Sequence, residues 1–246
     1  MERGDRPPVG TFYSRAPFAA GGVVRLSDAA AHHARVKRLG QNDVVRLTNG
    51  TGAIARGSIA ALDRSAVDIR IDQVQMIAAP AAVHARVPIA DRDRMLWLGE
   101  KLTELGVTSW QAVRFRRSAS VSPRGEGAVF ADKLRQRMIA ALEQSGGAWL
   151  PRILADAVPD AIDVGQNAMR IVLAVDGAPI TTVLGQHPAS EPVLLVGPEG
   201  GFEMEERAAL ASRGWTAATL APATLRFETA AMAAVAIARA QRLEAS

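Results

Sequence analysis

Apolar and polar positions divide the chain into two parts with different periods. From about residue 80 onward, short apolar runs rich in β-branched residues alternate with longer segments that have helical spacing. The apolar runs occupy residues 83–89, 110–115, 169–175, 193–196 and 215–220, and the helical segments occupy 91–105, 130–144, 202–213 and 230–240. Strands that alternate with helices predict a mostly parallel sheet, so we expect an α/β domain there.

The first part of the chain follows the two-residue period of half-buried strands. Residues 44–48 and 67–72 alternate apolar and polar side chains, and Asn49-Gly50 is the strongest short signal for a hairpin. A helix capped by Ser27 is expected over residues 29–39. These signals predict a small β-barrel-like domain with one helix. We place the boundary so that the two domains comprise residues 1–75 and 76–246.

The composition of the 246 residues excludes several classes of protein. No run approaches the roughly 20 apolar residues of a membrane span, and the N-terminal residues lack the apolar core of a secretory signal. The chain has no cysteine, which excludes disulfides and thiol chemistry and fits a cytoplasmic protein. Its four histidines lack the spacing of metal ligands, so we expect no metal site.

Basic residues outnumber acidic ones by 29 to 25, and nearly all of them are arginine. Guanidinium groups bind phosphate bidentately and stack on bases, so their distribution bears on RNA binding. Two basic groups stand out, one at Arg35, Lys37 and Arg38 and the other at Arg114, Arg116, Arg117 and Arg124. Two such groups in separate domains predict an RNA-binding groove between them, whereas the alternative is two solvated faces.

The run at 193–196 leads into a glycine loop, Gly197-Pro198-Glu199-Gly200-Gly201, and then into a helix with glutamates in its first turn. A glycine loop before a helix commonly binds phosphate, but no lysine follows here and Glu199 would repel a phosphate. A ligand that is neutral or cationic where it meets Glu199 fits better, and S-adenosylmethionine, with its sulfonium, is such a ligand. A tight turn built from glycines is the structural alternative.

A second loop, Leu225-Arg226-Phe227-Glu228-Thr229, lies between the last strand and the last helix. Glu228 and Thr229 are ordinary residues for the start of a helix. Arg226 lies one turn ahead of that helix and beside the ligand loop. We expect it either to form an ion pair with Glu199 or Glu228, or to face the substrate.

Together the two loops resemble the paired signature of the RsmE family. Gly197 to Phe202 and Leu225-Arg226-x-Glu228-Thr229-Ala230 carry this signature. Other segments agree with the family: residues 101–107 with its K-x-T-E-L-G-V, residues 143–146 with its E-Q-S-G, and residues 33–50 with its N-terminal segment. The similarity covers about residues 11–243.

The resemblance implies an S-adenosylmethionine-dependent enzyme that methylates the N3 atom of a uridine in small-subunit (16S) ribosomal RNA, either as naked RNA or in the assembled subunit. It also implies a SPOUT-type α/β domain tied in a trefoil knot, a PUA-like β-barrel RNA-binding domain in front of it, and a homodimer. The cofactor would be held by residues of three loops: Ala174, Val196, Gly197, Gly200, Gly201, Leu220, Leu225 and Arg226.

Three residues are candidates for the catalytic step that this resemblance implies. The imide proton of uridine must leave before N3 can accept a methyl group. Arg226 would stabilise the developing anion, or Glu199 or Glu228 would accept the proton as a general base. The sequence does not decide among these roles.

Some positions depart from the family pattern. Ala221-Pro222-Ala223 stands where the family has Gly-Pro-Arg, Phe227 replaces a small polar residue, and Gly147 stands where an arginine commonly follows. The changes around Ala221 and Phe227 motivate one alternative, a non-catalytic RNA-binding or ribosome-assembly factor. A second alternative is a related SPOUT methyltransferase that acts on another RNA, such as tRNA.

Overall fold

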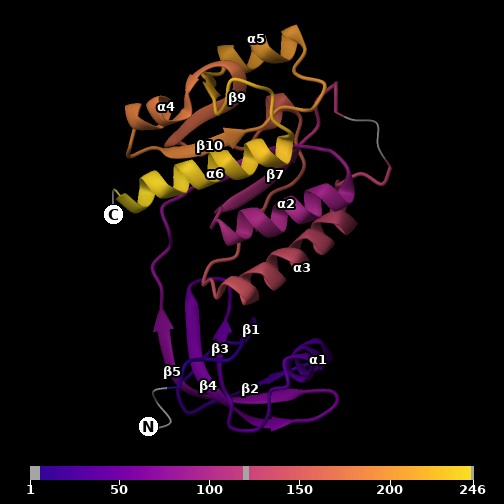
Figure 1. Ribbon diagram of the computed structural model, residues 1–246, viewed down its shortest axis with the longest axis vertical. Coiled ribbons are helices and arrows are strands. Elements are labelled where there is room, and N and C mark those ends of the chain that lie inside the picture. The colour runs from indigo at the N-terminus through magenta and orange to yellow at the C-terminus, as the bar shows by residue number, and fades with distance from the viewer. Residues whose placement is uncertain (1–5, 119–121, 245–246) are drawn as a thin grey trace. The chain divides into compact units, whose positions relative to one another are not determined.

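The computed structural model describes residues 6–118 and 122–244, which divide into two compact units (Figure 1). The first unit comprises Met1–Ala79 and Ile139–Leu150, and the second comprises Pro80–Met138 and Pro151–Ser246. The division falls within helix α3 (Gly127–Ser145), whose last turns belong to the first unit. The domain boundary between residues 75 and 76 stays a prediction.

The strands of the first unit form one sheet in the order β1-β3-β4-β5-β2, and its pairs are antiparallel except for β1 with β3. Its elements are β1 (Thr11–Tyr13), β2 (Val23–Leu26), α1 (Asp28–Val36), β3 (Val44–Thr48), β4 (Ala53–Leu62) and β5 (Val67–Met76). Alternation turns Val45, Leu47, Ile69 and Ile71 inward, where they form a core with Ala34 of α1. The expected barrel-like sheet with one helix is confirmed.

Two local features of the first unit differ from the prediction. Ser27 occupies the N-cap of α1 without a side-chain hydrogen bond, and the helix ends at Val36 because Arg38 adopts a left-handed φ of 57°. The predicted hairpin between β3 and β4 is present, but four residues connect the strands. The Asn49 Oδ1 atom holds this turn by accepting hydrogen bonds from the amides of Thr51 at 2.8 Å and Ala53 at 3.0 Å.

The described strands of the second unit form a sheet in the order β11-β9-β10-β6-β7-β8, and every pair in it is parallel. The strands are β6 (His84–Pro88), β7 (Ser109–Val113), β8 (Arg152–Ile153), β9 (Ala168–Pro179), β10 (Glu191–Leu195) and β11 (Thr216–Thr219). The helices are α2 (Arg92–Glu104), α3, α4 (Ile180–Gln186), α5 (Met204–Ser212), α6 (Phe227–Glu244) and the 3-10 turn η2 (Pro159–Ala161). None of the described helices is long and apolar enough to cross a membrane.

Strand β9 is longer than the sequence predicts, because its last residues pair with β11. The register between the two strands shifts between Ala217 and Ala218. Gly177 permits this close approach, since a Cβ atom there would lie 2.5 Å from the Ala218 amide nitrogen. The extended end of β9 therefore lies against β11, beside the site described below.

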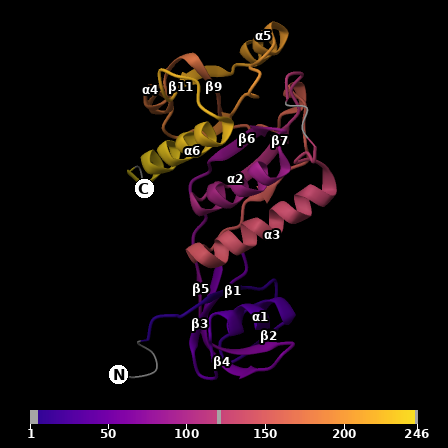
Figure 2. The same cartoon turned by 45° about the vertical axis from the view of Figure 1, so that its right-hand side comes forward.

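A second close approach places α2 on α3, and both views show these helices alongside one another (Figures 1 and 2). A Cβ atom on Gly99 of α2 would lie 2.2 Å from the Leu134 Cδ1 atom, and Leu134 is fully buried. Packing therefore requires a glycine here, although glycine is a poor helix former.

We expect Gly99→Ala to lower the free energy of unfolding by about 1–3 kcal/mol, because the added methyl group overpacks a buried contact. The matched control is Gly185→Ala in α4, where an added Cβ meets nothing within 4 Å. That substitution should stabilise the protein by about 0.5–1 kcal/mol. Urea unfolding measures both values, and stabilisation by Gly99→Ala would contradict the tight packing of α2 on α3.

Candidate active site

The second half of β9 and the loops that follow β10 and β11 enclose a pocket of 630 Å³ in the second unit, so Ala174 lies in a strand and not in the expected loop. Because β9, β10 and β11 are parallel, their carboxyl ends lie at one edge of the sheet, where open α/β sheets bind ligands. The volume falls within the range of about 300–1,000 Å³ that is typical of ligand sites. All but one of the predicted cofactor-binding residues line it: Ala174, Val196, Gly197, Gly200, Gly201, Leu220 and Leu225. The exception is Arg226.

The glycine loop takes its shape from close packing and from a capped helix. A Cβ atom on Gly197 would lie 2.7 Å from the Phe202 ring, and Gly201 has a left-handed φ of 72°. At the start of α5, Glu203 and Glu206 form a reciprocal capping box, in which the Glu203 amide donates to the Glu206 side chain at 3.0 Å. These carboxylates place negative charge at the amino end of the helix, which disfavours a phosphate there.

The few charges that line the pocket favour a cation over a phosphate. The charged lining residues are Asp176, Glu199 and Arg207. Arg207 donates to both carboxylate oxygens of Asp176 at 2.8 Å, so the two charges of this pair neutralise each other. Glu199 supplies the remaining negative charge, and its side chain is 43% exposed.

Arg94 of α2, a residue that the sequence did not single out, binds both glutamates of the predicted site. Its Nη2 donates to Glu199 Oε1 at 2.6 Å and to Glu228 Oε2 at 2.8 Å, and its Nε donates to Glu228 Oε1 at 2.5 Å. Its guanidinium carbon also lies 4.7 Å from the centre of the Phe227 ring. The hydrogen bonds to Glu228, aided by those to Glu199, raise the pKa of Arg94 above its ordinary value. This cluster joins α2, the glycine loop and α6.

The structure separates the positions of Glu199, Glu228 and Arg226. Glu199 lines the pocket, whereas Glu228 does not, and the Glu228 side chain is only 12% exposed. Arg226 is exposed, and its guanidinium has no ion pair with any described carboxylate. The prediction of an ion pair between Arg226 and these glutamates is wrong, because Arg94 occupies that place. The alternative role of Arg226, facing the substrate, stays a prediction.

Sequence reasoning missed Arg94 because it lies 105 positions from Glu199 and 134 from Glu228. A local signal was nevertheless present. Asp91 caps α2 by accepting hydrogen bonds from the amides of Asp93 and Arg94 at 3.0 Å, which puts Arg94 in the first turn of the helix. A cation is unfavourable at the positive end of a helix dipole, so an arginine there needs a carboxylate partner.

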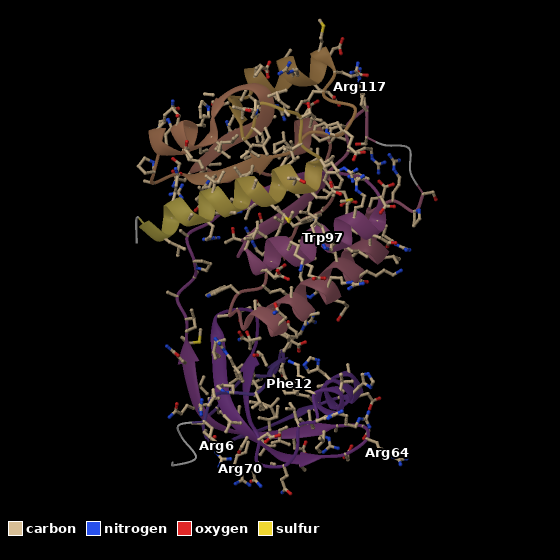
Figure 3. The ribbon with its side chains drawn as sticks, in the orientation of Figure 1. Arg6, Phe12, Arg64, Arg70, Trp97 and Arg117 are labelled. Atoms are coloured by element: carbon tan, nitrogen blue, oxygen red, sulfur yellow. The ribbon has the colours of Figure 1, made fainter. Side chains whose placement is uncertain are left out.

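The basic residues predicted to bind RNA are placed in both units. Arg116 Nη1 donates to Glu203 at 3.0 Å, Arg117 Nη1 donates to the Gly200 carbonyl at 3.4 Å, and Figure 3 shows Arg117 near α5. The other predicted residues are Arg114 and Arg124, which both approach Glu126, and Arg35, Lys37 and Arg38, which are exposed near the end of α1. Arg116 and Arg117 therefore border the candidate site, and the groove between the two basic groups stays a prediction.

Comparison with known families bears on both units. Residues 78–239 match the family described as RNA methyltransferase domain, and residues 26–72 match the RNA methyltransferase PUA domain. The chain belongs to this RNA methyltransferase family. The ribosomal RNA small subunit methyltransferase E of Mycobacterium bovis is 27% identical over 219 residues, which cover 85% of this chain and 82% of that protein. The enzyme of the same name from Rickettsia conorii is 27% identical over 223 residues, 87% of each.

A solved structure supports the same relationship. The ribosomal RNA small subunit methyltransferase E from Neisseria gonorrhoeae, bound to S-adenosyl methionine, has a TM-score of 0.83 and 27% identity, covering 92% of this chain and 95% of that one. The resemblance to the RsmE family is confirmed, as is the fold class, a SPOUT-type α/β domain with a PUA-like barrel in front of it. The trefoil knot stays a prediction.

We expect Arg94→Met to lower the free energy of unfolding by about 2 kcal/mol, because hydrogen bonds between charged groups contribute about 1.5–3 kcal/mol and Glu228 would lose its partner. The matched control is Arg92→Met on the same helix, since Arg92 is half-buried to a similar degree but its ion pair is with the exposed neighbouring Asp93. That control should leave the unfolding midpoint in urea unchanged. Equal losses in both variants would contradict the structural role of Arg94, and Arg94→Lys should restore stability only in part.

Proposed function

We propose that this protein uses S-adenosylmethionine to methylate the N3 atom of a uridine in small-subunit (16S) ribosomal RNA. The observation that carries the proposal is the pocket itself, where a glycine loop without lysine presents Glu199 to the ligand. A phosphate-bearing cofactor would be repelled there, and a sulfonium would be attracted. The relatives named ribosomal RNA small subunit methyltransferase E support the choice of RNA.

The residues of the pocket fit S-adenosylmethionine. Leu220 and Leu225 offer apolar surface for the adenine ring, and the Asp176–Arg207 pair offers opposite charges to the amino and carboxylate groups of the methionine part. Glu199 presents its carboxylate to the positive sulfonium. When bound, this cofactor supplies an electrophilic methyl group.

The task of the chain's own residues is to remove the proton from uridine N3, and Glu199 is the best-placed base. It lines the pocket, and Arg94 engages only its Oε1 atom, which leaves Oε2 for the proton. Glu228 has both oxygens bonded to Arg94, so we assign it a positioning role. Arg226 follows the pocket residue Leu225 and would stabilise the negative charge that develops on the uracil ring.

We assign RNA binding to residues 1–75 as the PUA-like domain, assisted by the basic residues 114–124, and catalysis to residues 76–246. The matches to a PUA domain and to a methyltransferase domain support this division. The place of action is then the cytoplasm, where small ribosomal subunits are assembled, and cell fractionation would test it.

We further infer that the second unit is tied in a trefoil knot and that the protein is a homodimer. The chain crosses from β10 over β9 to pair β11 with the far edge of β9, and a crossover of this kind supports a knot. The partly exposed alanines of α6, such as Ala233 and Ala236, would permit close approach of a second subunit. Light scattering should give twice the 26.0 kDa mass of the chain, and a monomer would contradict the dimer.

Deleting the gene should remove one methyl group from one uridine of small-subunit RNA, and the wild-type gene should restore it. The Glu199→Gln variant should restore little, since loss of a general base slows a reaction by about 10²–10⁴-fold. The Arg226→Ala variant should slow it by about 10²-fold while still binding cofactor. Mass analysis of digested RNA measures the methyl group, and calorimetry measures S-adenosylmethionine binding.

The matched control is Glu205→Gln, because Glu205 is an exposed glutamate of α5 outside the pocket lining. It should restore full methylation. Absence of S-adenosylmethionine binding at millimolar concentration would favour a non-catalytic RNA-binding factor instead. A methyl group lost from tRNA rather than from small-subunit RNA would identify a different substrate, and full turnover by Arg226→Ala would remove its electrostatic role.

A further inference from the structure

The outward face of the first unit's sheet carries a second pocket, of 410 Å³, which we call the arginine pocket. It lies on the face of β3, β4 and β5 opposite to the apolar core, and α1 with its basic residues packs on the core side. The residues that carry the argument are Arg6, Asn42, Arg56, Arg70, Asp72 and Gln73. Figure 3 labels Arg6 and Arg70 on this unit, and both line the pocket.

A β-bulge directs an unusual set of side chains into the arginine pocket. Neighbouring residues of a strand normally point to opposite faces, yet Asp72 and Gln73 both line the pocket. The register explains this, because Gly57 of β4 pairs with Ile71 while Arg56 pairs with Gln73, which leaves Asp72 as the extra residue. Bulges of this kind re-aim side chains and are common next to functional sites.

Only glycine permits this bulge. A Cβ atom at position 57 would lie 2.2 Å from the Arg70 carbonyl oxygen, which is a backbone atom and cannot move aside cheaply. The close approach of β4 to β5 at Gly57 thus determines where Arg70 and Asp72 lie along the pocket.

Guanidinium groups outnumber carboxylates among the residues that line the arginine pocket. Three guanidinium groups face one carboxylate, and Arg46 of β3 lies directly opposite Arg56, an arrangement that destabilises a sheet by repulsion. Arg70 and Asp72 form no ion pair within 4.0 Å with each other or with another described residue. Their hydrogen-bonding groups are therefore available to a ligand that carries both an anion and N–H donors.

We propose that the arginine pocket binds one unpaired nucleotide of the RNA, with a preference for guanine. Guanidinium groups pair with phosphate oxygens bidentately and stack on bases, which assigns the phosphate to Arg6 and Arg70. Arg56 Nη2 donates to the Arg6 carbonyl and so positions Arg6. Proteins read unstacked RNA bases on their Watson–Crick edges. Guanine alone presents two adjacent N–H donors on that edge, from N1 and N2, and these match the two oxygens of Asp72. This proposal rests on the proposed function only in taking RNA as the partner.

RNA is favoured over an acidic peptide because of what surrounds the pocket. The segment that matches the RNA methyltransferase PUA domain, residues 26–72, contains Asn42, Arg56, Arg70 and Asp72. Asp72 would repel an acidic side chain, whereas a guanine base offers it hydrogen-bond donors.

The test uses the full-length protein and short single-stranded RNA probes that carry guanosine, inosine or adenosine at one position in oligouridine, with affinity measured by fluorescence anisotropy across a salt series. The wild-type protein should bind the guanosine probe about tenfold more tightly than the inosine probe, which lacks the N2 amino group. Asp72→Asn should abolish this difference. Arg70→Gln should weaken the binding of all probes about tenfold. It should also reduce the slope of the logarithm of affinity against the logarithm of salt concentration by about one.

The matched control is Arg64→Gln, because Arg64 is an exposed arginine of the same unit that lies outside the pocket (Figure 3). It should keep the affinity and the guanine preference of the wild-type protein. Equal affinities of the wild-type protein for guanosine and inosine probes, or equal effects of Arg64→Gln and Arg70→Gln, would overturn the proposal. Displacement of the probes by polyglutamate without base preference would identify an acidic protein partner instead.

Failure of this proposal and failure of the proposed function are distinguishable. Binding of S-adenosylmethionine, measured by calorimetry, should be the same in Asp72→Asn, Arg70→Gln and the wild-type protein, since the cofactor pocket lies in the other unit. A guanine preference without cofactor binding would support the nucleotide site and contradict the methyltransferase function. Cofactor binding without a guanine preference would contradict the nucleotide site and leave the methyltransferase function supported.

Discussion

One guanidinium shared by two carboxylates sets the geometry of the cofactor site. Arg94 bonds Glu199 of the glycine loop and Glu228 of α6, so three segments far apart in the sequence must be in place together. Glu228 is nearly buried, and leaving its charge without the Arg94 partner costs about 2 kcal/mol. Helix α6 therefore cannot move away from α2 without that cost, whereas the half-exposed Glu199 of the loop would lose its hydrogen bond to Arg94. Since α2 is itself seated on α3 at Gly99, core packing determines where the pocket's carboxylate lies.

Much of the second unit could be predicted from the spacing of apolar residues alone, because that spacing differs between buried parallel strands and amphipathic helices. The residues of the pocket could be predicted as well, since strand ends and glycines mark them in the sequence. The partners of Arg94 could not be predicted, because they lie more than a hundred positions away. The bulge at Asp72 was equally invisible. A single extra residue in a strand changes which side chains face outward, and only the pairing with β4 reveals it.

Charge is divided over the molecule in a way that suits two different ligands. The cofactor pocket and the Arg94 cluster contain more carboxylates than guanidinium groups, whereas Arg116 and Arg117 border the glycine loop. Glu199 would repel a phosphate that entered with the base. Under the proposed function, the target uridine would therefore reach the pocket with its phosphates left outside, near the bordering arginines, as in enzymes that take a base out of its stack.

The departures from the family pattern can now be divided by their physical setting. Phe227 is 2% exposed and lies under the guanidinium of Arg94, so it supports the ion cluster. At Gly147 a Cβ atom would lie 2.7 Å from Leu142, so a larger residue would require that side chain to shift. Ala221 and Ala223 line the pocket and replace a segment that usually contains an arginine. Only this last change removes a cation from the mouth of the site. Under the proposed function, Arg117 and Arg226 would then contact the RNA phosphates, and the carboxylate that would face the methyl donor is unchanged.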